Sequence, residues 1–133
     1  MTAVQVSDRV RTPVLSALLV IVALGVFTQA ILAGVFISET TPIKFVHLVV
    51  GSVLPVFAIV PAVVAWVRAA QGAVTKGFAG LTTLLVVALW VQEALGHVSF
   101  PVTTAVHVPL GVLLFAGSTA LAVLSICRGR AER

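Results

Sequence analysis

The chain has 133 residues, of which 60% are hydrophobic and 9% are charged, and its mean hydropathy is +1.22. Soluble domains carry about 25% charged residues, so this composition excludes an ordinary soluble domain and indicates a membrane protein. The pI near 10.8 does not indicate a nucleic-acid-binding surface, because the basic residues lie at the edges of apolar segments.

The eight basic and four acidic residues are placed so that long uncharged segments separate them, at residues 12–38, 45–67, 77–92 and 94–127. A transmembrane helix needs about 20 mainly apolar residues, so each segment is near one bilayer crossing if the third includes Glu93 and the fourth begins after Pro101. We therefore expect four spans in a single domain of residues 1–133, over 13–37, 44–67, 77–98 and 103–127.

Links of a few residues between these spans favour antiparallel neighbours. The predicted fold is an all-α membrane protein, a four-transmembrane up-down-up-down helix bundle in which the second and fourth helices lie diagonally opposite. The single cysteine, Cys127, has no partner, which excludes disulfides and cysteine-held clusters.

The basic residues predict the orientation of the bundle. Seven of the eight precede the first span, lie between the second and third spans, or follow the fourth, and Lys44 alone falls in an opposite loop. Lys and Arg near span ends stay on the cytoplasmic side, so we expect a multi-pass protein of the plasma membrane with both termini cytoplasmic. A cleaved signal peptide is the competing interpretation of the N-terminus, but the apolar run continues to Ile37.

The sequence also contains an internal similarity. The segments 29–35 and 92–98 both begin with glutamine, and a histidine follows 18 or 15 residues after each glutamine, at the start of the next span. Each histidine is followed four residues later by glycine, and the pairs are His47 with Gly51 and His107 with Gly111. These similarities predict two helical-hairpin repeats, 28–60 and 91–123, derived from one unit.

The two histidines are predicted to lie at one depth. His47 is 21 residues before Arg68 and His107 is 21 residues before Arg128, which places both about 31 Å from the cytoplasmic boundary. Helices that pack 8 to 10 Å apart have a diagonal of roughly 13 Å, which suits two imidazoles on either side of a flat iron-containing cofactor. His97 lies 21 residues from Lys76 and shares this level.

Small residues accompany the histidines. Gly51 and Gly111 remove side chains one turn from each imidazole, where the edge of a porphyrin would otherwise collide, and four further small residues would widen the slot: Gly25, Gly34, Ala88 and Gly96. The alternative is that both histidines bind lipid headgroups and both glycines are sites of close helix packing. We favour the functional interpretation because ionisable groups inside a bilayer are costly and usually functional.

Other polar residues surround this candidate site. His97 follows Glu93 by one turn, and it is either a third ligand, a proton relay or a capping histidine near the outer surface. Glu93 is expected either beside His97 near the surface or protonated, because an unpaired carboxylate in an apolar run is costly. Gln29 and Gln92 are expected to form hydrogen bonds across the bundle or to line the cofactor pocket, and Glu39 is expected to be a solvated loop residue.

The pattern Gln-x-x-Leu-[Ala/Gly], a short outer loop and a histidine opening the next span resembles the haem A synthase family over residues 25–125. Members resemble two fused four-helix bundles, each with a histidine pair from its second and fourth helices around a haem. The resemblance implies that His47 and His107 are axial ligands. The chain corresponds to one half only, Glu39 lies eight residues before His47, and the outer-loop cysteines of some members are missing, so haem hydroxylation is not implied for a single chain.

The sequence therefore predicts a small integral membrane b-type haem protein, with haem b (iron protoporphyrin IX) held by His47 and His107 near the outer face. Its expected roles are electron transfer, redox sensing or haem handling, and its expected partners are the lipid bilayer and haem, with a second copy or a larger redox complex as further partners. The alternatives are a cofactor-free accessory subunit or small transporter with a polar path through Glu93 and His97, and a homodimeric haem A synthase-like enzyme.

Overall fold

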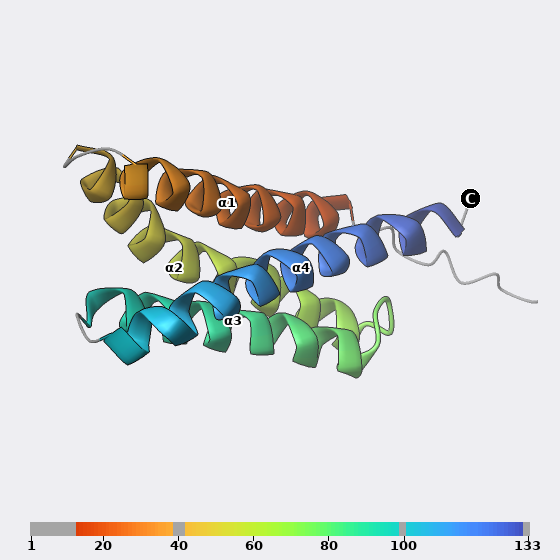
Figure 1. Cartoon of the computed structure of the whole chain (residues 1–133). Helices are drawn as coiled ribbons and strands as arrows, with labels where there is room; N and C mark the ends of the chain where they lie inside the picture. The colour runs from red at the N-terminus through yellow and green to blue at the C-terminus, as the bar shows by residue number, and fades with distance from the viewer. Residues whose placement is uncertain (1–12, 39–41, 99–100, 132–133) are drawn as a thin grey trace, which may run out of the picture.

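The computed structural model describes residues 13–38, 42–98 and 101–131. Within them the chain is helical, apart from a short link between the second and third helices and Val98 at the end of the third. The helices, coloured from red to blue in Figure 1, are α1 (Pro13–Ser38), α2 (Pro42–Ala70), α3 (Lys76–His97) and α4 (Pro101–Ala131). The predicted all-helical architecture with four long helices is confirmed.

α1, α2 and α4 extend slightly beyond the predicted spans, and α3 is displaced from its predicted span by one residue. α2 begins at Pro42 instead of residue 44, and α4 begins at Pro101 instead of residue 103. Proline is favoured in the first turn of a helix, because its missing N–H has no intrahelical acceptor there. Pro55, Pro61 and Pro109 lie inside helices, which transmembrane helices tolerate.

All four helices are long and apolar enough to cross a membrane, which supports a multi-pass membrane protein. The candidate spans are Pro13–Val35, Pro42–Ala70, Lys76–His97 and Ala105–Arg128. Large apolar side chains remain exposed along every helix, as expected where the surface faces lipid instead of water.

The link between α2 and α3 is built from standard helix-end interactions. Gly72 has a φ of 73°, and its N–H donates to Ala69 O (3.1 Å) while Ala73 N–H donates to Arg68 O (2.9 Å). This pattern is the Schellman motif, which requires the left-handed conformation that glycine adopts without strain. Thr75 then caps α3 by accepting a hydrogen bond from Phe78 N–H (3.1 Å).

The core is narrow and consists mainly of leucine, valine and alanine. Leu15, Leu19 and Val22 of α1 are fully buried. Three buried hydroxyl groups donate to carbonyls in the preceding turn of their own helix, so they need no partner from another helix: Thr82, Ser118 and Ser125.

The helices contact one another in a closed ring. α1 packs against α2 and α4, and α3 packs against α2 and α4 (Figure 1). Within the described residues, α2 and α4 make no direct backbone approach, and neither do α1 and α3. The helices that carry His47 and His107 are therefore separated by the other two.

Candidate functional site

Two equivalent hydrogen bonds join each glutamine of the two similar segments to the histidine of the next helix. Gln29 Nε2 on α1 donates to the backbone oxygen of His47 on α2 (3.1 Å). Gln92 Nε2 on α3 donates to the backbone oxygen of His107 on α4 (3.0 Å). The interhelical hydrogen bonding expected of the two glutamines is thus present, and it links each glutamine to the histidine of the following helix.

The two glycines one turn after the histidines make room for these polar side chains. A Cβ atom at Gly111 would lie 3.2 Å from Gln92 Nε2. A Cβ atom at Gly51 would lie 3.4 Å from Glu93 Oε2 and 3.7 Å from Gln29 Nε2. The space that was expected for a porphyrin edge is taken by amide and carboxyl groups, so a haem at this place would require Gln29 and Gln92 to adopt other rotamers.

His107 is oriented by its contacts with α3. Its Nδ1 lies 3.1 Å from the backbone oxygen of Gln92, and because a carbonyl can only accept, Nδ1 carries the proton. A Cβ atom at Gly96 would lie 3.3 Å from Cε1 of the ring, so the absence of a side chain at Gly96 permits the imidazole to pack against α3. This arrangement leaves Nε2 as the nitrogen that can bind a ligand. Metal-binding histidines commonly donate their other ring N–H to a carbonyl in this way.

Glu93 lies at the centre of a second polar group. Its Oε1 accepts a hydrogen bond of 2.5 Å from Ser52 Oγ on α2 and lies 3.6 Å from His97 Nδ1. His97 Nδ1 also donates to Glu93 O (3.0 Å). Glu93 and His97 are therefore neighbours, as expected from the sequence. The side chain of Glu93 is 16% exposed and that of His97 is 51% exposed, so the carboxyl group is the more enclosed of the two.

The sequence-based reasoning did not identify Ser52. Its hydroxyl donates to Leu48 O (3.0 Å) as well as to Glu93. Serine often bonds only to its own helix in apolar segments, and this made Ser52 inconspicuous. The available signal was that Glu93, an acidic residue inside an apolar run, needs a donor from a neighbouring helix.

The two groups of polar residues lie close together. A Cβ atom at Gly51 would lie within 4 Å of both Gln29 and Glu93, so the carboxyl group of Glu93 lies beside the glutamine that binds His47, although α2 and α4 do not approach each other directly. Within the described residues, no group of three or more His, Cys, Asp and Glu side chains could hold a metal ion. Bis-histidine haem ligation requires two protein ligands, so it remains a prediction.

The small residues expected to widen the slot have different surroundings. A Cβ atom at Gly25 would lie 2.6 Å from Leu54 Cδ1, so Gly25 admits a leucine of α2 and opens no slot. Gly34 has open space beside it. Ala88 lines a cavity between α3 and α4 that contains no histidine. Glu39, which was expected in the outer loop, lies outside the described residues.

The chain matches no protein-family model, and no curated protein or solved structure is significantly similar to it. The resemblance to the haem A synthase family is therefore supported only by the residues that carry it.

Proposed function

We propose that the protein is a small integral membrane haem protein in which His47 and His107 bind the iron of a b-type haem near the outer membrane surface. The observation that carries the proposal is the hydrogen bond from His107 Nδ1 to Gln92 O (3.1 Å). It orients one imidazole and leaves its Nε2 for a metal, as backbone carbonyls that accept from metal-binding histidines do in known sites.

The arrangement of the helices supports this proposal. The backbones of α2 and α4 do not approach each other directly, so a flat group could lie between these two helices, whereas neighbouring helices at 8 to 10 Å are too close. The paired bonds Gln29 to His47 and Gln92 to His107 support two repeated helical hairpins in an up-down-up-down bundle. We further propose that the basic residues keep both termini cytoplasmic, in the plasma membrane.

Bis-histidine ligation favours electron transfer, redox sensing or haem handling. Both axial positions of the iron are filled, so the bound haem would exchange electrons with little rearrangement. His97 does not have a ligand role in this proposal, because it is half-exposed and bonded to Glu93. The partners would be haem and the lipid bilayer, together with a second copy or a larger redox complex.

The test is the reduced-minus-oxidised absorption spectrum of the purified protein, after expression with haem supplied. The expected result is sharp, split visible bands that are lost in both His47→Ala and His107→Ala. His97→Ala is the matched control and should keep the bands. Far-ultraviolet circular dichroism should show helical content in all variants. Wild-type protein that is colourless and takes up no haem would contradict the proposal.

A second candidate function is a proton-conducting or accessory role without a cofactor. The observation that favours it is the carboxyl group of Glu93, which lies within an apolar helix and contacts Ser52 on one side and the half-exposed His97 on the other. Intramembrane carboxyl groups that reach the surface through a histidine are typical of proton pathways.

This second function is tested in liposomes that contain the purified protein and a pH-sensitive dye. A pH-dependent proton flux that is lost in Glu93→Gln and kept in His107→Ala would support it. A flux equal to that of protein-free liposomes would contradict it. The two candidates are distinguished because the haem proposal expects His107→Ala to remove the visible bands.

A further inference from the structure

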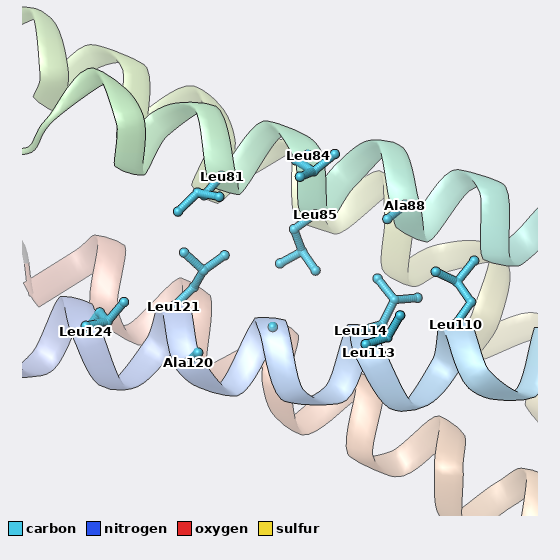
Figure 2. Close-up of a pocket in the computed structure, with 11 residues that line it drawn as sticks. Leu81, Leu84, Leu85, Ala88, Leu110, Leu113, Leu114, Ala120, Leu121 and Leu124 are labelled. Carbon is cyan, nitrogen blue, oxygen red and sulfur yellow. The ribbon is translucent and has the colours of Figure 1, made fainter.

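A cavity of about 350 Å³ lies between α3 and α4. In Figure 2, side chains of both helices point into the same gap, with Leu81 and Leu85 from α3 and Leu114 and Leu121 from α4. Every residue that lines it is leucine, alanine or glycine: Leu81, Leu84, Leu85, Ala88, Leu110, Leu113, Leu114, Gly117, Ala120, Leu121 and Leu124. The cavity therefore suits a hydrocarbon chain and offers no polar partner.

The cavity is long in the direction of the helix axis. On α4 its lining extends from Leu110 to Leu124, which is about 21 Å at a rise of 1.5 Å per residue. The hydrocarbon core of a bilayer is about 30 Å thick, or about 15 Å per leaflet, so the cavity is long enough for a whole acyl chain of one leaflet.

A positive charge is held at one end of the cavity. Arg128 follows Leu124 by one helical turn, and its guanidinium carbon lies 4.8 Å from the centre of the Phe78 ring on α3. Phe78 itself is 3% exposed and precedes Leu81, which lines the cavity, by three residues. This cation–π contact places the charge over the junction of α3 and α4. A guanidinium group presents forked N–H donors that match a phosphate.

No acidic side chain competes for this charge in the part of the chain that the structure describes. Glu93 is the only acidic residue there, and it contacts Ser52 and His97 instead. Arg128 is exposed, so an anion at the membrane surface can reach its guanidinium group.

We propose that the α3–α4 cavity binds one acyl chain of an anionic phospholipid whose phosphate is held by Arg128. A zwitterionic lipid carries the same phosphate together with a cationic headgroup, so the positive charge of Arg128 favours an anionic lipid, whose headgroup has no cation. The uninterrupted apolar lining accepts the chain itself. This site is separate from the histidines and does not depend on haem binding.

The test is native mass spectrometry of the delipidated protein with phosphatidylglycerol or phosphatidylcholine of identical acyl chains. The wild type should retain phosphatidylglycerol about five-fold more strongly, which corresponds to the ~1 kcal/mol that one basic residue contributes at an anionic membrane surface. Arg128→Gln should abolish this preference. Arg68→Gln is the matched control, because Arg68 is also a basic residue near the end of a helix and its guanidinium group donates to Gln71, away from the cavity lining, and it should leave the preference unchanged.

A second pair of variants tests the cavity itself. A Cβ atom at Gly117 would meet nothing within 4 Å, so a side chain can begin there without a clash, and Gly117→Leu should fill part of the cavity and lower the binding of both lipids. Gly80→Leu, at an equally open position outside the cavity lining, should not. The proposal is overturned if Arg128→Gln keeps the preference, if Gly117→Leu binds lipid as the wild type does, or if the cavity proves to hold an isoprenoid or a second copy instead.

Discussion

Gln92 and His107 are joined by two hydrogen bonds that run in opposite directions between α3 and α4. Gln92 Nε2 donates to His107 O (3.0 Å), and His107 Nδ1 donates to Gln92 O (3.1 Å). The backbone of each residue thus accepts from the side chain of the other, and Gly96 and Gly111 leave room for both side chains. The pair fixes the relative height of the two helices and the orientation of the imidazole.

Replacing Gln92 by leucine should lower the free energy of unfolding by about 1 kcal/mol, because one interhelical hydrogen bond is lost. Gln29→Leu should have an effect of the same size, since Gln29 makes the equivalent bond to His47. The measurement is a denaturant titration in mixed micelles, followed by circular dichroism. Gln71→Leu is the control, because the side chain of Gln71 is exposed and accepts a hydrogen bond from Arg68 of the same helix end instead of bridging two helices. Equal stability of Gln92→Leu and Gln71→Leu would contradict the prediction.

Gly25→Ala should destabilise the contact between α1 and α2. The new methyl group would lie 2.6 Å from Leu54 Cδ1, and Leu54 is only 8% exposed and has little room to move. Overpacking of this kind costs about 1 to 3 kcal/mol. Gly80→Ala, where a Cβ atom meets nothing within 4 Å, should be neutral or stabilising. Combining Gly25→Ala with Leu54→Ala should cost less than the sum of the two single changes.

Ser52→Ala should lower the free energy of unfolding, because it removes the hydrogen bond from Ser52 to Glu93. The hydroxyl of Ser52 donates a short bond to the carboxyl group (2.5 Å), and removing this donor leaves a mostly enclosed carboxyl oxygen without that bond, which costs about 1 to 3 kcal/mol. A double-mutant cycle with Glu93→Gln measures the coupling between the two residues. We expect a coupling energy of at least about 1 kcal/mol. Additive effects of the two substitutions would show that the residues do not interact.

Gly72→Ala should destabilise the link between α2 and α3 by about 1 to 2 kcal/mol, because the φ of 73° is unfavourable for a residue with a Cβ atom. No side chain stands within 4 Å of the position, so the effect would come from backbone conformation alone. Gly72→Asn should be milder, since asparagine tolerates this region better. The thermal unfolding of the wild type, Gly72→Ala and Gly72→Asn should be compared. Equal stability of Gly72→Ala and the wild type would contradict the left-handed conformation at position 72.

The number of helices and their approximate ends could be predicted from the sequence. Charges are so scarce in this chain that each uncharged segment has the length of one bilayer crossing. The neighbourhood of Glu93 and His97 was also predictable, because residues four apart on a helix lie on one face. Ser52 was not, because the distance between positions 52 and 93 in the chain says nothing about which helix faces meet.

The tertiary structure decided what the glycines and glutamines contact. The His-x-x-x-Gly spacing indicated that Gly51 and Gly111 leave space one turn from each histidine, but not what occupies it, and the neighbouring helices fill it with Gln29, Gln92 and Glu93. Gly25 likewise admits Leu54 instead of widening a slot. Composition and charge spacing determine which segments enter the membrane, because transfer into lipid depends on each segment by itself. Contacts between helices depend on the rotation of each helix about its axis, which only the packing of all four together sets.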